Sequence, residues 1–279
     1  MASLKWRDQR WRVTLLIWVA LLASHRARAE VVEVTLLADD SYPPYSYSEN
    51  HEAQGIYKDI INEAGRLMPD YRISIIALPW KRGLMLIEDG KAFAIYPPYK
   101  HPEDRPYMNP YSEPLLSERV SVFCRPEVFL SHPRHVWPDD YYGLKFANNL
   151  GFSIGGEKFY QALTNNLLTM REYAGTRKSL MALWVGEVDC YMNGDFSIRW
   201  ELAQMNKDES IRRSGFTLRL EEGSVISEQQ GYLGYTDRDK GQYPFKRDFI
   251  EQFDQAVRTI KQEGKIQAIE QKYKKLLGE

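Results

Sequence analysis

The sequence predicts an α/β protein of two lobes, each built on an open, mostly parallel sheet. Short runs rich in Val, Leu, Ile and Thr alternate with segments whose apolar residues recur at helical spacing, a pattern typical of open α/β units. The pattern runs through residues 33–96 and restarts near residue 144. Because no low-complexity linker separates the two units, we expect two strands to join the lobes as a hinge, near 117–120 and 231–236.

The first unit follows the order strand, helix, strand, helix, strand. Residues 33–38 (EVTLLA) and 72–78 (RISIIAL) are predicted strands. The apolar repeat over 60–68 predicts a helix between them. A short second helix ends at Gly90, which suits a C-cap, and 92–96 (AFAIY) is the third predicted strand.

The second unit repeats this design. Residues 144–147 predict a short strand, and a helix is expected over about 157–168. Apolar residues within 180–184 lie on one face of a further helix that ends at Gly186. The run 188–192 (VDCYM) is then a predicted strand, so the two lobes are expected to share one architecture.

The C-terminal part contains two amphipathic helices after the strand at 231–236. Their apolar stripes run over 249–260 and 266–276, and such stripes need a surface to pack on, most simply the first lobe. The predicted organisation is a first lobe of residues 30–118 and 235–279 and a second lobe of residues 119–234.

Residues 1–29 have the pattern of a secretory signal peptide. A basic stretch precedes an apolar run at 13–23, which falls short of the roughly 18 residues that span a bilayer. Small residues at Ala27 and Ala29 follow, at the positions that a signal peptidase reads. We therefore expect a secreted, periplasmic protein cleaved near Ala29, rather than one held by a membrane anchor.

Composition excludes several partner classes. The formal net charge is −1 and no basic run is present, so we expect no nucleic-acid partner. No His or Cys residues have metal-ligand spacing, so neither a metal nor a cofactor is expected. The two cysteines, Cys124 and Cys190, could form one bridge in an oxidising compartment or remain two buried thiols. We expect the chain to be a monomer.

Four segments occur in an order and spacing that carry a family resemblance. They are ADDSYPPYSY at 38–47, GIYKDII at 55–61, HPEDRPYMNPYSEPL at 101–115 and KQEGKIQAIEQKY at 261–273. The chain resembles the family 3 extracellular solute-binding proteins, the receptors of amino-acid ABC transporters, over nearly all of 30–279. The resemblance implies the two-lobed, type II periplasmic-binding-protein fold.

The resemblance also implies a ligand cleft between the lobes, with its main contacts on the first lobe. Arg105 would hold a ligand carboxylate, because a planar guanidinium offers two parallel donors. Asp39 and Tyr42, at the end of the first strand, would meet the ligand amine and side chain. The alternatives are a structural arginine, a turn aspartate and a tyrosine packed in its loop.

The second lobe would complete the cleft with two weaker matches. Ser153 stands in the turn before a helix, where backbone N–H groups suit an anionic oxygen. Family members have an acidic residue in this lobe that pairs with the ammonium group of the ligand. Asp195 lies next to that position, but the residue that aligns with it is Gly194.

Several residues depart from the family pattern. Pro97 replaces a small hydroxyl residue, and proline offers no N–H to a ligand. Phe93 stands where an acid is usual. Trp80, Arg82 and Tyr96 add two aromatic rings and a cation, so we expect an aromatic-rich pocket that keeps one carboxylate clamp.

These observations predict a binder that closes its lobes around a small polar or carboxylate-bearing solute. The implied partner is a membrane permease or a sensor receptor. No nucleophile elbow, phosphate loop or metal motif is present, so we predict no catalytic residue and no enzyme activity. The alternatives are a lyase like the cyclohexadienyl dehydratases that share this scaffold, and a ligand-sensing protein.

Overall fold

The computed structural model describes residues 30–130, 132–213 and 218–278. The predicted signal peptide at 1–29 lies outside these residues. From Glu33 onward the chain forms one compact unit. Among the described helices, none is both long and apolar enough to cross a membrane.

The first lobe is built on a five-stranded sheet in the order β5-β1-β6-β13-β7. Its strands are β1 (Val32–Asp39), β5 (Tyr71–Leu78), β6 (Ala94–Tyr96), β7 (Met108–Tyr111) and β13 (Gly234–Thr236). Strand β1 runs parallel to β6, whereas β13 is antiparallel to both β6 and β7. The carboxyl end of β1 leads into a small antiparallel sheet of β2 (Ser41–Tyr42), β3 (Ser46–Glu49) and β4 (Glu52–Gln54), where the sequence predicts only a loop.

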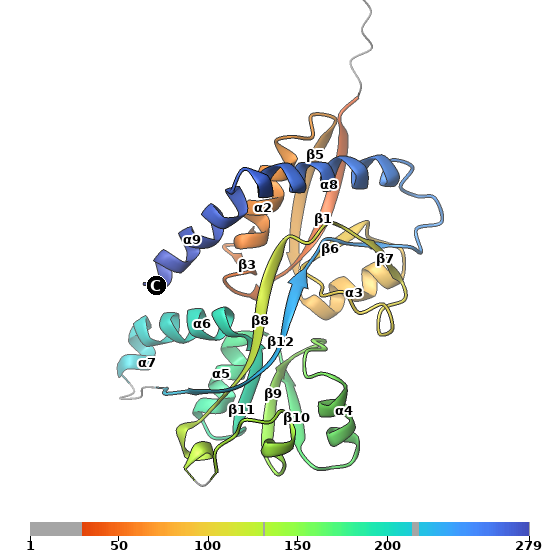
Figure 1. Ribbon diagram of the computed structural model, residues 1–279. Helices are drawn as coiled ribbons and strands as arrows, with labels where there is room; N and C mark the ends of the chain where they lie inside the picture. The colour runs from red at the N-terminus through yellow and green to blue at the C-terminus, as the bar shows by residue number, and fades with distance from the viewer. Residues whose placement is uncertain (1–29, 131, 214–217, 279) are drawn as a thin grey trace, which may run out of the picture. The chain divides into compact units, whose positions relative to one another are not determined.

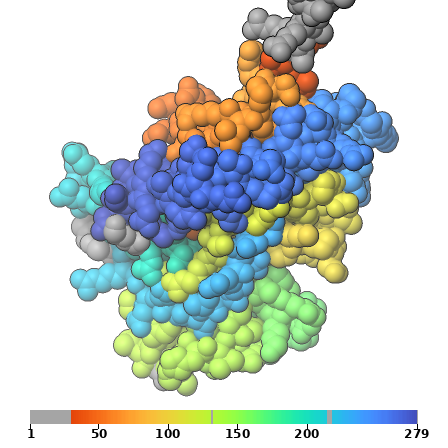
Figure 2. Space-filling model, turned by 45° about the horizontal axis from the view of Figure 1, so that its top comes forward, coloured from red at the N-terminus to blue at the C-terminus, as the bar shows by residue number. Residues whose placement is uncertain are grey.

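Four helices belong to this lobe, namely α2 (Ile56–Gly65), α3 (Trp80–Glu88), α8 (Lys246–Gln262) and α9 (Lys265–Leu277). Helices α2, α8 and α9 pack against one another (Figure 1). The C-terminal helices lie beside the residues near position 60 on the face seen in Figure 2. The apolar stripe of α8 is fully buried at Phe249, Phe253 and Val257.

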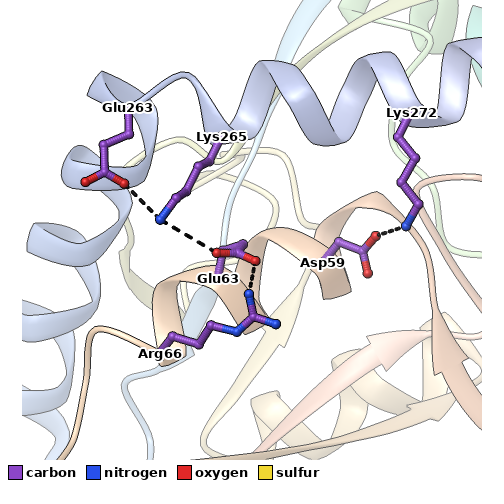
Figure 3. Close-up of polar contacts among 6 residues, drawn as sticks. All are labelled: Asp59, Glu63, Arg66, Glu263, Lys265 and Lys272. Atoms are coloured by element: carbon purple, nitrogen blue, oxygen red, sulfur yellow. Dashed lines mark hydrogen bonds and ion pairs between the residues drawn. The ribbon is translucent and has the colours of Figure 1, made fainter.

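Ion pairs fasten α9 to α2 at the surface (Figure 3). Lys272 Nζ lies 2.9 Å from an Asp59 oxygen, and Lys265 Nζ lies 3.9 Å from Glu63 and 2.9 Å from Glu263. Exposed pairs of this kind contribute about 0–1 kcal/mol each. The attachment therefore depends more on the buried ring of Tyr273, which is 6% exposed.

The second lobe has its own five-stranded sheet in the order β10-β9-β11-β8-β12. Its strands are β8 (Leu116–Cys124), β9 (Lys145–Asn149), β10 (Thr169–Tyr173), β11 (Cys190–Gly194) and β12 (Glu221–Gly231). Its helices are α4 (Glu157–Thr164), α5 (Thr176–Trp184), α6 (Asp195–Lys207) and α7 (Glu209–Arg213), with two short 3₁₀ turns, η1 (Pro126–Phe129) and η2 (Asp139–Tyr141). Strands β10, β9 and β11 are parallel, and β8 is antiparallel to β11 and β12.

Two hydrophobic clusters stabilise this lobe. One contains Phe146 and Phe159, and the other contains Leu180, Leu183 and Ile198. Cys124 and Cys190 lie opposite each other on β8 and β11 and form a disulfide bond. The sequence leaves open a disulfide bond or two buried thiols, and the structure contains the disulfide bond.

The two lobes are joined by a pair of antiparallel strands. Strand β8 runs beside β12 along most of its length, from Leu116 opposite Gly231 to Cys124 opposite Glu221 (Figure 1). Beyond β12 the chain enters the first sheet as β13. The strand predicted at 231–236 is thus two strands, because β12 ends at Gly231 and β13 begins at Gly234.

Candidate functional site

Arg105 is a buried cation that forms no ion pair with an acidic residue in the described part of the chain. It lies in the loop between β6 and β7, where its N–H donates to the His101 carbonyl and its own carbonyl accepts from Met108. The residue is 6% exposed. Its guanidinium lies over the Trp80 ring, 5.6 Å from the centroid, and donates one long bond of 3.4 Å to the Gly151 carbonyl.

This environment is costly for a charge. Burial lowers the pKa of Arg105 from its ordinary value, and no ion pair is formed by it among the described residues. A buried charge is normally paired with an opposite charge or well hydrogen-bonded. The position therefore suits an anion supplied from outside the chain.

A small cavity lies beside Arg105, between residues of both lobes. Its volume is about 20 Å³, which is room for a water molecule but not for a solute. Its walls are mostly aromatic and apolar, from Tyr42, Trp80, Pro97, Tyr99, His101, Phe152 and Ile154, together with Ser153 and Arg105. A wider surface groove of about 1210 Å³ adjoins it and shares His101, Ser153 and Ile154.

Phe152 of the second lobe fills the space between two rings of the first lobe. Its ring meets Tyr42 edge-on at 5.3 Å and Trp80 edge-on at 6.1 Å, measured between centroids. Such pairs add about 0.5–1.5 kcal/mol each beyond the area they bury. The two lobes are therefore in contact here, through the ring of Phe152.

Two further polar atoms at this cavity have no partner. The Trp80 indole Nε1 and the His101 Nε2 are buried without a hydrogen bond in the described structure. The indole N–H and the Arg105 guanidinium can both donate hydrogen bonds but cannot accept them. This wall of the cavity offers hydrogen-bond donors to an incoming group.

A buried carboxylate with three tyrosine donors lies behind the cavity. Glu118 on β8 is 2% exposed. Its Oε2 accepts from Tyr42 Oη at 2.5 Å and from Tyr99 Oη at 2.8 Å, and its Oε1 accepts a very short bond from Tyr57 Oη. Burial raises the pKa of Glu118 to about 7, although the three tyrosine bonds act in the opposite direction.

Sequence reasoning missed Glu118 and the hydrogen bonds that Tyr57 and Tyr99 donate to it. One signal was present for Glu118. In the strand LSERVSVFC it stands two positions from both Leu116 and Val120, and residues two positions apart in a strand point to the same face. A glutamate at such a position needs partners. Those partners come from three distant parts of the chain, which no local pattern reveals.

Four of the predicted site residues line the cavity, namely Arg105, Tyr42, Trp80 and Ser153. The Ser153 hydroxyl donates to Asp104 Oδ2 at 3.1 Å, at the cavity mouth. Asp39 ends β1, is 2% exposed and accepts from the Ser41 N–H at 2.9 Å. Burial raises the pKa of Asp39 to about 8, so its carboxyl is protonated at neutral pH.

The other three predicted residues lie elsewhere in the described structure. Arg82 is exposed on α3. Tyr96 is fully buried in β6, with a hydroxyl that has no partner. Asp195 pairs with Arg119 at 2.7 Å and lines a separate pocket with it. At the neighbouring Gly194, an added Cβ would stand 2.4 Å from the Tyr42 hydroxyl, so a side chain there would displace that hydroxyl.

The sequence matches the profile of the bacterial extracellular solute-binding proteins, family 3, over residues 34–275. The chain belongs to this family. A comparison with curated proteins gives no match. The predicted resemblance is thereby confirmed, and the two-lobed architecture described above is the architecture of a solute-binding protein.

Solved structures with the same fold have low sequence identity to this solute-binding protein. One comes from work on glutathione import by GshT and the cystine ABC importer TcyBC of Streptococcus mutans, with a TM-score of 0.69, 14% identity, and coverage of 88% of this chain and 95% of that chain. A histidine kinase sensor domain has a TM-score of 0.67, 15% identity, and coverage of 88% and 96%. The ancestral amino acid-binding protein AncCDT-1, a precursor of cyclohexadienyl dehydratase, has a TM-score of 0.64, 12% identity, and coverage of 86% and 95%. At these identities the likeness establishes the fold alone, the type II periplasmic-binding-protein fold.

Proposed function

We propose that this solute-binding protein takes a small, carboxylate-bearing solute of amino-acid type into the cavity at Arg105 and closes its lobes around it. The observation that carries the proposal is the buried Arg105 guanidinium, which has no carboxylate partner within residues 30–130, 132–213 and 218–278 and lines a cavity together with Trp80, whose indole N–H also has no partner there. A bidentate carboxylate would satisfy both the charge and the geometry of the guanidinium.

Closure would take place at the β8–β12 pair. Residues 30–118 with 235–279 would move as one lobe and 119–234 as the other. The solute would first contact Tyr42, Trp80 and Arg105, and Ser153 with Phe152 would then close over it. A solute that touches both lobes only in the closed state stabilises that state by its differential affinity.

The proposed setting is the periplasm, after removal of residues 1–29 near Ala29. A disulfide such as that between Cys124 and Cys190 persists in oxidising compartments, which supports this setting. The closed, loaded protein would be delivered to an ABC permease, as in the transport systems named for one of the similar structures. A monomer suffices for this role.

The test is binding of a carboxylate panel to the protein and to Arg105→Ala. The mature protein is unfolded and refolded to remove carried-over solute, then titrated by calorimetry with amino acids, their amides and simple carboxylates. Truncating one partner of a buried charge pair costs about 2–5 kcal/mol, so Arg105→Ala should lower affinity by at least about tenfold. Arg247→Ala, whose side chain is 91% exposed, is the matched control. Equal affinities for carboxylates and their amides would contradict the proposal.

A second candidate is an enzyme on the same scaffold, favoured by the buried Asp39. A carboxyl that keeps its proton at neutral pH can serve as a general acid, and the pKa of Asp39 is about 8. One similar structure is an ancestor of a dehydratase. Incubation with cyclohexadienyl acids, followed by detection of aromatic product, separates the two functions. Formation of product by the wild type, with its loss in Asp39→Asn, would favour the enzyme. Absence of product from the wild type would favour the binder.

A further inference from the structure

The hydroxyl protons of three tyrosines are committed to Glu118. A tyrosine hydroxyl has one proton to donate and two lone pairs. Tyr42, Tyr57 and Tyr99 each direct that proton to a Glu118 oxygen. An ionised carboxylate is a stronger acceptor than another hydroxyl, so the 3.2 Å contact between the Tyr42 and Tyr99 hydroxyls does not take either proton.

Two of these tyrosines, Tyr42 and Tyr99, also line the cavity at Arg105. Since their protons are used, each oxygen can offer only lone pairs to a bound group. The lining also includes two donor groups, from Arg105 and Trp80. The cavity wall at Tyr42 and Tyr99 therefore only accepts hydrogen bonds, whereas Arg105 and Trp80 donate them.

We propose that Glu118 determines solute specificity by acting through Tyr42 and Tyr99. By holding both protons, it makes this wall accept hydrogen bonds only, so that the solute must present a donor there, an ammonium group, as well as the carboxylate taken by Arg105. The inference rests on the proposed function and narrows it to zwitterions, such as α-amino acids. Glu118 is a positioning residue in this scheme, because it touches the tyrosines rather than the solute.

The surroundings of Glu118 fix this arrangement. The Tyr42 hydroxyl rests against Gly194, and the Tyr57 hydroxyl rests against Gly231, where an added Cβ would lie 2.4 Å and 1.8 Å away respectively. The backbone of Tyr99 bridges to Gly231 on the hinge. Larger residues at either glycine would push a hydroxyl off the carboxylate.

Other charged and titratable groups near Glu118 do not replace it. Asp195 acts on it only through space, because its own carboxylate is paired with Arg119. The Tyr45 hydroxyl also feels the Glu118 charge but makes no hydrogen bond to it in the described structure. The tyrosine trio is thus held by Glu118 alone among the described residues.

The experiment compares matched solutes in the protein and in Glu118→Gln. The probes are L-phenylalanine and L-glutamine, each paired with the acid that lacks only the amino group, 3-phenylpropanoate and glutaramate. Titrations are run above pH 7, where Glu118 is ionised. The protein should prefer each amino acid to its deaminated partner by roughly tenfold to a hundredfold.

Glu118→Gln should remove most of that preference. With its amide nitrogen in place of Oε2, glutamine donates to Tyr42 and Tyr99, which must then turn their own protons toward the cavity. With the nitrogen in place of Oε1 it donates to Tyr57 instead, and the two Tyr→Phe variants below then provide the test. Affinity for the amino acids falls by roughly tenfold or more, while affinity for the deaminated acids stays within a few-fold. Glu251→Gln, an exposed acid on α8, should change neither.

Tyr42→Phe and Tyr99→Phe provide an independent route if Glu118→Gln does not fold, which circular dichroism reports. Each removes one acceptor and should reduce the preference for amino acids. If every folded variant keeps the wild-type preference for the amino acids over the deaminated acids, the inference is overturned. The proposed function still stands in that case, provided that carboxylate binding depends on Arg105. Absence of Arg105-dependent binding for all four probes would overturn the proposed function and the inference with it.

Discussion

At the scale of single residues, buried groups that depart from ordinary pairing mark the site. Among the described residues, Arg105 is a cation without an acidic partner, Glu118 is a buried carboxyl that accepts from three tyrosine hydroxyls, and Asp39 is a carboxyl kept protonated by burial. Each costs stability in the folded state. A function in the cleft gives a physical reason for keeping them.

The titration of Asp39 and Glu118 predicts how stability changes with pH. Burial raises their pKa values from 3.8 to about 8 and from 4.5 to about 7. Between the unfolded and folded values the folded state binds more protons, so the free energy of unfolding falls as pH rises from about 4 to about 8. The slope is at most about 1.4 kcal/mol per pH unit for each group.

Urea unfolding at several pH values between 4 and 8 measures this slope. Asp39→Asn and Glu118→Gln should each flatten it. The half-buried carboxyls of Asp140 and Asp208 have lowered pKa values, so they titrate below this interval. Burial lowers the pKa of His101, which acts in the opposite direction within the interval, but one such group is outweighed by the two carboxyls. Greater stability at pH 8 than at pH 5 would contradict the assignment of both buried groups.

At the scale of elements, the sequence predicted those whose apolar pattern is strong. The runs at 33–38 and 72–78 match β1 and β5, and the stripe over 249–260 matches α8. Strand β12 was missed before Gly231, because its residues EEGSVISEQQ are mostly polar and half-exposed. Its strand structure comes from backbone pairing with β8, which is a tertiary property.

The same distinction applies to the site. Family resemblance pointed to Arg105, Tyr42 and Ser153, and Trp80 was expected beside them as an added aromatic ring; these four residues line one cavity. Each of them belongs to a recognisable local segment. The Glu118 cluster joins residues 42, 57, 99 and 118, whose approach depends on how the small β2–β4 sheet, α2 and the hinge are packed together. Local periodicity carries no information about that packing.

The disulfide between β8 and β11 predicts a stability difference at this scale. The bridge closes a separation of 66 residues, and removing such a link typically costs about 2–4 kcal/mol. The double variant Cys124→Ser, Cys190→Ser should unfold at correspondingly lower urea. Reduced wild-type protein serves as the control and should show a similar loss. An unchanged midpoint in both would contradict a structural role for the bridge.

At the scale of the whole molecule, the proposed closure makes the β8–β12 pair and the aromatic contacts across the cavity the features that would set the balance between open and closed forms. Phe152 brings the second lobe onto Tyr42 and Trp80, while β8 and β12 carry the connection. The β8 strand belongs to the second-lobe sheet through its pairing with β11, and Arg119 on β8 also pairs with Asp195 and Glu222. Bending is therefore expected at the Leu116 end of β8.

Phe152→Ala tests this balance. The variant loses two edge-on ring contacts, worth about 1–3 kcal/mol together, so closure should be weaker and affinity about tenfold lower. X-ray scattering at saturating L-phenylalanine or L-glutamine should give a larger radius of gyration than for the wild type. Leu130→Ala, an exposed residue of the second lobe, is the control. A radius equal to that of the wild type would contradict the role given to Phe152.

The unpaired charge of Arg105 has a further consequence for transport. A receptor that closed while empty would present the same outer faces to a permease as a loaded one, and the transporter would hydrolyse ATP without moving cargo. Closing Arg105 away from water with no counter-ion raises the energy of that empty form. Under the proposed function, the residue that holds the solute would thus also disfavour closure, and hence delivery, without a solute.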